Sequence, residues 1–255
     1  MIHFITYGDD NYEETKKRLC SQARSLSDGT SDDGTSDGDS WFNTITSYSP
    51  DDLDDDFKER FKNILEQPRG GGYWIWKPYI INKHLEKMED GDILIYLDAG
   101  CHINPSGRER FNEYIEMLKN SEEGAISFQM SQHIEKKWTV KEIFEYFNIH
   151  KDSRDIIESG QIIATVRMFK KNSNSTNLVS SWLNTLYYKP LLFTDHYNKK
   201  EQSDIFIDNR HDQSVLSVLS KLYKTIIIED ETYFAEGFGC PKSLKCPFWA
   251  TRLRM

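Results

Sequence analysis

Apolar residues in this chain gather into short unbroken runs, and the clearest run spans residues 92–98. It reads Asp-Ile-Leu-Ile-Tyr-Leu-Asp, with no polar residue between the two acids. A strand that is apolar at every position is buried on both faces, as strands are in a parallel sheet covered by helices. Weaker runs of the same kind predict further strands at 2–7, 125–129, 161–170 and 225–229.

Longer stretches between these runs carry apolar residues at helical spacing. They predict helices over residues 12–23, 51–66, 74–87, 108–120, 140–147, 178–186 and 213–223. Strands that alternate with helices are typical of an α/β fold, with a mostly parallel sheet flanked by helices. No Pro-rich or Gly/Ser-rich linker divides the middle of the chain, so we expect a single domain over residues 1–255.

A low-complexity acidic segment at about 25–40 departs from this pattern. It reads SLSDGTSDDGTSDGDS and repeats a Ser-Asp-Gly-Thr unit. Gly, Ser and Asp cannot build a core, so we expect a mobile, solvated loop. Its acids lack the spacing and the closing Glu of an EF-hand, so calcium binding is not expected.

Charge and composition disfavour several classes of protein. A net charge of −9 argues against nucleic acid as the main partner, because phosphate binding needs clustered Lys and Arg. No stretch approaches the roughly 18 apolar residues of a membrane span, and the N-terminus lacks the features of a signal peptide. The four Cys form no CxxC pair, so we expect a cytoplasmic protein with reduced thiols.

Two acids stand where ligands bind in this class of sheet. In an open α/β sheet, ligands bind beyond the carboxyl ends of the strands, and Asp9 and Asp98 follow the first strand and the clearest one. The small residues Ala99 and Gly100 let a bulky group approach the backbone there. Carboxylate oxygens suit Mg²⁺ or Mn²⁺ shared with substrate phosphates. The alternative is that each Asp serves only as a helix cap or a turn residue.

Four segments of the chain follow one another in the order of a known enzyme family. They read GGYWIWKPYII at 71–81, ILIYLDAG at 93–100, SGQIIA at 159–164 and HDQSVLSVL at 211–219. These segments resemble those of small GT-A glycosyltransferases encoded by large DNA viruses of algae and by capsule-making bacteria. Together they cover about residues 73–223, and four motifs in order are far more specific than one.

The resemblance implies a GT-A, nucleotide-diphospho-sugar transferase-like fold and a defined pair of substrates. The donor is a nucleotide-sugar, expected to be UDP-linked, and the acceptor is a glycan hydroxyl. A viral protein of this kind is expected in the cytoplasm of the host cell. The expected donor-binding residues are Tyr7, Gly8, Asp9, Arg69, Tyr73, Trp76, Lys77, Ala99 and Gly100, and the expected acceptor-binding residues are Gln161 and Gln213.

Trp74 and Trp76 are separated by two positions, so on a helix they cannot both face one way. We therefore expect one of them in the core and the other near the ligand.

The family binds a divalent metal through an Asp-x-Asp motif, and this chain departs from that motif. Its version, Asp98-Ala99-Gly100, supplies a single carboxylate. The expected cofactor is Mn²⁺ or Mg²⁺, held by Asp98, the donor diphosphate and His102 or His211. The metal would act as a Lewis acid toward the leaving nucleoside diphosphate.

Asp212 is the expected catalytic residue. An inverting transfer needs a base that accepts the proton of the acceptor hydroxyl, and Asp212 lies in the last motif at the start of a predicted helix. The alternative is that Asp212 is only the N-cap of that helix. In a retaining mechanism, Asp212 or Gln213 would instead lie near the far face of the donor sugar.

Two other classes of protein compete with this interpretation. A non-catalytic carbohydrate-binding protein that kept the fold is supported by Gly100 in place of an acid. A nucleotidyltransferase would carry a Gly-rich, basic phosphate loop after the first strand, where this chain has the acidic sequence Gly8-Asp9-Asp10-Asn11. The sequence leaves the oligomeric state open.

The low-complexity segment generates a first prediction. Deletion of residues 27–39 should shift the melting temperature by only a few degrees, because such a segment buries little apolar surface. A thermal melt of the deletion variant beside the full chain measures this. A collapse of stability would show that the segment is a structured element.

Overall fold

The computed structural model describes residues 1–27 and 40–254. The predicted acidic loop at about 25–40 therefore falls almost wholly outside the described residues. The two flanks of this gap lie side by side, because the Trp41 backbone N–H donates to the Leu26 carbonyl at 3.0 Å.

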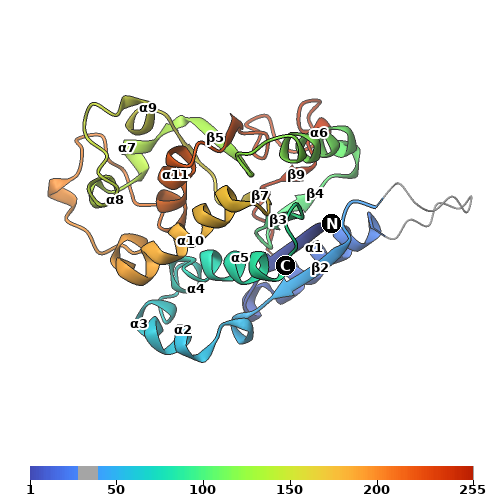
Figure 1. Ribbon diagram of the computed structural model, residues 1–255, viewed down its shortest axis with the longest axis horizontal. Helices are drawn as coiled ribbons and strands as arrows, with labels where there is room; N and C mark the ends of the chain where they lie inside the picture. The colour runs from blue at the N-terminus through green and yellow to red at the C-terminus, as the bar shows by residue number, and fades with distance from the viewer. Residues whose placement is uncertain (28–39, 255) are drawn as a thin grey trace, which may run out of the picture.

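A mixed sheet forms the centre of the molecule (Figure 1). Within the described residues it has seven strands, of which six follow the order β2-β1-β3-β7-β5-β6 while β8 also pairs with β5. Their bounds are β1 Ile2–Tyr7, β2 Thr44–Tyr48, β3 Ile93–Leu97, β5 Ala125–Ile134, β6 Gly160–Ile162, β7 Val166–Lys170 and β8 Ile226–Glu229. A separate pair joins β4 (His102–Ile103) to β9 (Phe248–Trp249).

Most strands of the sheet run in one direction. The pairs β1–β2, β1–β3 and β5–β8 are parallel. β7 is antiparallel to both β3 and β5, and β6 is antiparallel to β5. β1, β2, β3, β5 and β8 therefore share one direction, which confirms the predicted mostly parallel sheet.

Helices cover both faces of this sheet. The helices α1 (Glu13–Ser25) and α6 (Arg108–Lys119) pack on one face, and α5 (Trp76–Lys87), α10 (Ser173–Tyr188) and α11 (Asp212–Leu222) pack on the other (Figure 1). The shorter helices are α2 Asp55–Arg60, α3 Lys62–Leu65, α4 Gly70–Tyr73, α7 Glu135–Trp138, α8 Lys141–Tyr146 and α9 Arg154–Ile157.

Strand β3 confirms the prediction of a strand buried on both faces. Ile93, Ile95 and Leu97 enter the core beneath α1 and α6. Leu94 and Tyr96 enter the core on the opposite face, and all five side chains are buried. The alternation of neighbouring side chains across a strand explains this division.

Some boundaries differ from the sequence-based predictions. β2 was not predicted, because Thr-Ile-Thr-Ser-Tyr at an edge of the sheet is mostly half-exposed and carries no apolar run. The predicted strand at 161–170 is two strands, β6 and β7, which both pair with β5 but are separate in the chain. The predicted helix at 51–66 is likewise divided into α2 and α3 at Phe61.

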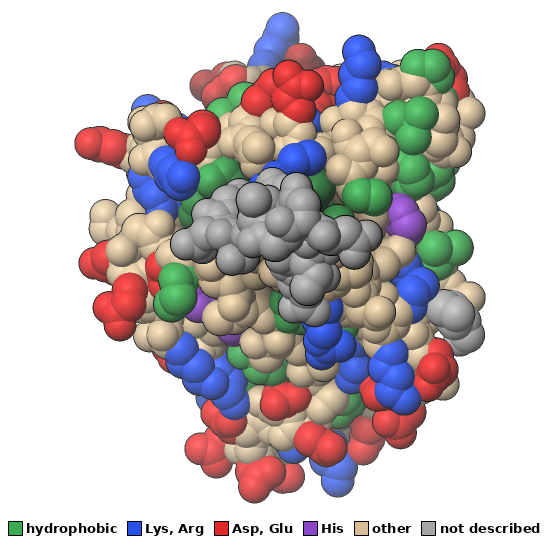
Figure 2. Space-filling model, turned by 90° about the vertical axis from the view of Figure 1, so that its right-hand side faces the viewer, with side chains coloured by type: hydrophobic (Ala, Val, Ile, Leu, Met, Phe, Trp, Pro, Cys, Tyr) green, Lys and Arg blue, Asp and Glu red, His purple; other side chains and the backbone are tan. Residues whose placement is uncertain are grey.

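Charged side chains of both signs are mixed on the surface. Figure 2 shows Asp and Glu side chains interspersed with Lys and Arg over the face turned to the viewer. Among the described residues, no helix has the length and apolar character that a membrane crossing requires.

The segment from Gly70 to Trp74 is a left-handed turn. All five residues have positive φ, from 55° at Gly71 to 90° at Gly72. Gly adopts this conformation freely, whereas other residues lose about 1–2 kcal/mol each. A side chain at Gly72 would also collide with the backbone of α3, since its Cβ would lie 2.7 Å from the Leu65 Cα. The Gly-rich motif therefore serves a strained turn packed against α3.

This turn generates a second prediction. Gly72→Ala should lower the free energy of unfolding by about 2–4 kcal/mol, from the left-handed backbone and the collision with Leu65 together. Gly91→Ala is the matched control, because Gly91 has a φ of 89° but no atom lies within 4 Å of the position that its Cβ would take. The control should lose only about 1–2 kcal/mol in urea denaturation. Equal losses would contradict the collision.

Candidate active site

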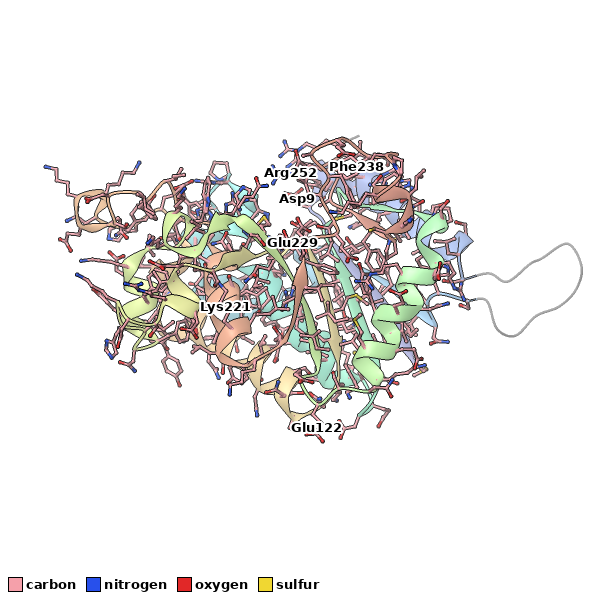
Figure 3. The ribbon with its side chains drawn as sticks, turned by 90° about the horizontal axis from the view of Figure 1, so that it is seen from above. Asp9, Glu122, Lys221, Glu229, Phe238 and Arg252 are labelled. Atoms are coloured by element: carbon pink, nitrogen blue, oxygen red, sulfur yellow. The ribbon has the colours of Figure 1, made fainter. Side chains whose placement is uncertain are left out.

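A cavity of about 710 Å³ opens at the edge of the sheet where β1 and β3 end. Figure 3 shows Asp9, Glu229 and Arg252 toward this edge and Glu122 at the opposite one. The walls come from the ends of β1 and β3, the left-handed turn, the start of α11 and residues 252–254. The cavity thus lies beyond the carboxyl ends of the parallel strands, where α/β sheets bind ligands.

The structure brings most of the predicted site residues together in this cavity. Those that line it are Tyr7, Gly8, Asp9, Arg69, Trp76, Lys77, Asp98, Ala99, Gly100, His211, Asp212 and Gln213. Three predicted residues are not part of its lining: Tyr73, His102 and Gln161.

A buried ion cluster lies on the floor of the cavity. The Lys77 ammonium, from the first turn of α5, lies 2.9 Å from the Asp98 Oδ1 and 3.4 Å from the Asp212 Oδ2. The ammonium also donates to the Ala164 carbonyl at 3.3 Å. Asp98 Oδ1 accepts a further hydrogen bond from the Tyr96 hydroxyl at 2.5 Å. One cation thus serves two carboxylates from separate parts of the chain.

Burial and charge set the protonation of this cluster. Burial raises the pKa of Asp212 to about 6, and the nearby Asp98 adds to the rise while Lys77 opposes it. Burial alone would lower the pKa of Lys77, but Asp212 and Asp98 outweigh it and hold that pKa above its usual value. Lys77 therefore stays protonated, and Asp212 can gain or lose a proton near neutral pH.

Asp212 is not the cap of α11. It is the first residue of the helix, the N-cap position belongs to His211, and the His211 side chain makes no capping hydrogen bond. Apart from the ion pair with Lys77, the buried Oδ2 of Asp212 has no hydrogen-bond partner among the described residues. The cap interpretation is therefore wrong, and the ion pair with Lys77 holds the Asp212 carboxylate beside the cavity.

His211 is held in a strained conformation beside Asp212. Its φ of 54° and ψ of −119° are rare for a residue with a side chain. The buried imidazole contacts the Asp195 Oδ1 through Nε2 at 2.8 Å and stacks on the Tyr73 ring at 4.8 Å. Tyr73 therefore packs against His211 and does not line the cavity itself.

Trp76 is buried in the core and half-buried Trp74 lines the cavity, as predicted, but Trp76 reaches the cavity as well. Trp74 lies in the left-handed turn before α5, and helical spacing therefore does not apply to the pair. The Trp76 ring stacks on Tyr7 at 3.8 Å between centroids, and its Nε1 donates to the Gly70 carbonyl at 3.1 Å. This stack joins the end of β1 to the Gly-rich turn.

Of the predicted metal ligands, Asp98 and His211 line the cavity and His102 does not. The His102 Nδ1 contacts Gln22 at 2.8 Å, and its ring stacks on Trp249 away from the cavity. Across the described residues, no group of three His, Cys, Asp or Glu side chains could hold a metal ion. Asp98 already has the Lys77 ammonium at 2.9 Å. This donor set does not fit a divalent cation.

The two glutamines predicted to bind the acceptor contact each other. Gln213 Nε2 donates to the Gln161 Oε1 at 2.7 Å, and the Gln213 Oε1 accepts from the Ala164 N–H at 3.1 Å. Gln161 is fully buried beneath the cavity. It can support Gln213, but in this structure it does not reach the cavity itself.

Several cavity residues were missed by sequence reasoning. Arg252 and Arg254 reach the cavity because residues 250–254 fold back over Gly100. Arg210 and Trp138 line it as well, with the Arg210 guanidinium 3.9 Å from the Trp138 ring centroid. None of them lies in a recognisable motif, apart from the proximity of Arg210 to the segment at 211–219.

Comparison with protein-family models and with curated protein sequences finds no match. Solved structures of glycosyltransferases do match. One involved in the glycosylation of the major capsid of PBCV-1 aligns over 97% of this chain and 92% of that chain, at 13% identity and a TM-score of 0.51. Mouse xyloside xylosyltransferase 1 aligns over 91% and 87%, at 10% identity and a TM-score of 0.47. The galactosyltransferase LgtC aligns over 96% and 83%, at 14% identity and a TM-score of 0.42.

The likeness to the glycosyltransferase involved in capsid glycosylation establishes the fold. The chain has the GT-A type of α/β fold, as the sequence predicts.

The ion cluster generates a third prediction. Lys77→Met should lower the free energy of unfolding at pH 7 by about 3–5 kcal/mol, because it leaves two buried carboxylates without a cation. A carboxyl group whose pKa is raised in the folded state makes the folded protein less stable as pH rises. The stability lost through Lys77→Met should therefore be smaller toward pH 5. Lys87→Met, at an exposed position of the same helix, should change stability by less than about 0.5 kcal/mol. A loss independent of pH would contradict the buried cluster.

Proposed function

We propose that this protein transfers a sugar from a nucleotide-diphosphate sugar to a hydroxyl group of a glycan. One observation carries the proposal: Asp212, a buried acid held by an ion pair with Lys77, lines a cavity beside Lys77 and Asp98. This site lies at the ligand-binding edge of a fold shared with a capsid glycosyltransferase.

The nucleoside of the donor is proposed to bind near the end of β1. Tyr7, Gly8 and Asp9 line that part of the cavity, and the Tyr7–Trp76 stack supplies a flat, rigid wall. Ala99 and Gly100 leave room for the diphosphate to approach the backbone after β3. UDP-sugars are the first donors to test.

Asp212 is proposed as the general base of an inverting transfer. The acceptor oxygen forms a bond to the anomeric carbon, the bond from that carbon to the diphosphate breaks, and the hydroxyl proton passes to Asp212. A base is most effective when its pKa lies near the working pH, and Asp212, with a pKa of about 6, meets this condition. Lys77 positions the carboxylate from the side of α5.

A non-catalytic sugar-binding protein is less well supported by this site. Burying a charged group costs free energy, and a protein that only binds a sugar does not need a buried charge. Active sites, by contrast, are where raised pKa values of buried acids cluster.

A donor screen tests the proposal directly. The purified chain is incubated with each common nucleotide-sugar and a set of glycan acceptors, and released nucleoside diphosphate and product mass are measured. Transfer from any donor supports the proposal, and the anomeric configuration of the product, read by NMR, separates inversion from retention. Sugar binding without transfer for every donor would favour the non-catalytic alternative.

The base generates a fourth prediction. Asp212→Asn should lower turnover by about 10²-fold or more while donor binding persists, because Asn keeps the size of the side chain but accepts no proton. In the native protein, turnover should fall as pH drops below about 6, because Asp212 gains a proton there. Asp204→Asn is the matched control, since Asp204 is exposed and does not line the cavity.

Near-normal turnover of Asp212→Asn would remove Asp212 from the role of base. A retaining mechanism would then be the interpretation to pursue.

A further inference from the structure

The segment 250–254 occupies the place where a second metal-binding acid would project from the turn after β3. A Cβ on Gly100 would lie 3.1 Å from the Leu253 carbonyl oxygen and 3.2 Å from the Arg252 Cα. The Leu253 N–H donates to the Gly100 carbonyl at 3.0 Å, and the Thr251 hydroxyl donates to the same oxygen at 2.7 Å. Backbone therefore fills the space that a side chain at position 100 would need.

The same segment brings two arginines to the cavity. Arg252 and Arg254 both line it, and both are exposed. Arg252 has a φ of 54°, a left-handed conformation that is unfavourable for a residue with a side chain. The two hydrogen bonds to Gly100 hold the backbone in place there. The Arg254 guanidinium lies 5.4 Å from the Tyr12 ring centroid, above the start of α1.

These arginines line the cavity together with Arg210, which is close enough to Arg252 for the two charges to repel each other. No carboxylate of the described residues forms an ion pair with Arg210, Arg252 or Arg254 within 4 Å. The other cations of the cavity are paired. Lys77 contacts Asp98 and Asp212, Arg69 contacts Asp195 and Asp208, and Lys58 lies 3.9 Å from Asp55. Three guanidinium groups without such a carboxylate, in a chain of net charge −9, mark a site for an anion.

We propose that Arg252 and Arg254, supported by Arg210, bind the diphosphate of the donor and stabilise the leaving nucleoside diphosphate in place of a divalent cation. This inference rests on the proposed function and assigns the residues that stabilise its leaving group. As the bond from the anomeric carbon to the diphosphate oxygen breaks, both bonding electrons stay on that oxygen. Guanidinium groups present paired N–H donors that match phosphate oxygens, so they can neutralise this charge.

Calorimetry of diphosphate binding by the full chain tests the inference without relying on turnover. The probes are UDP, GDP and inorganic pyrophosphate, each titrated once with EDTA present and once with Mn²⁺. Binding should be of similar strength in both buffers. Arg252→Ala and Arg254→Ala should each weaken it by about tenfold or more, as expected for the loss of a charge-assisted hydrogen bond.

Arg154→Ala is the matched control, because it removes the same charge from an exposed position on α9 outside the cavity. It should bind the probes like the native chain, and a thermal melt shows that each variant is folded. Binding that needs Mn²⁺ and ignores both cavity arginines would overturn this inference and leave the proposed sugar transfer intact. A folded chain that binds no probe in either buffer would overturn both proposals.

Discussion

The attraction between Lys77 and two carboxylates is the interaction on which the site depends. Placing an ammonium group in the interior costs several kcal/mol, and a single surface-type ion pair would not offset it. Asp98 and Asp212 offset it together, and they come from the end of β3 and the start of α11. One buried cation therefore determines how a strand and a helix meet at the floor of the cavity.

Strained backbone gathers around this cavity. Among the described residues with side chains, six have positive φ, and Trp74, His211 and Arg252 of these line the cavity while Tyr73 stacks on His211. Each such residue costs about 1–3 kcal/mol and persists only where its surroundings enforce it. The two packed cores on either side of the sheet supply that enforcement. The stability of the core thus supports unfavourable geometry at the site.

The parts that sequence reasoning predicted are those encoded by local pattern. The apolar run of β3 indicated burial on both faces, and the alternation of strands and helices indicated the α/β sheet. Asp98 and Asp212 could be named because each lies within a motif. β2 could not be predicted, because its edge position leaves a mixed sequence half-exposed.

The parts that were missed depend on contacts between distant residues. His102 was a reasonable ligand by type, but a partner on α1, Gln22, holds its ring elsewhere. Helical spacing does not describe Trp74, because this residue lies in the left-handed Gly-rich turn before α5. Arg252 and Arg254 carry no local signal, and their role arises only once the chain folds back across 151 positions from Thr251 to Gly100.

That long-range contact also separates the shape of the cavity from the integrity of the sheet. The strands of the central sheet end with β8 at Glu229, and the buried ion cluster comes from β3, α5 and α11. The wall over Gly100 comes instead from residues 251–253, which lie outside both. A substitution in this segment can therefore reshape the cavity while every strand of the sheet and the ion cluster stay as they are.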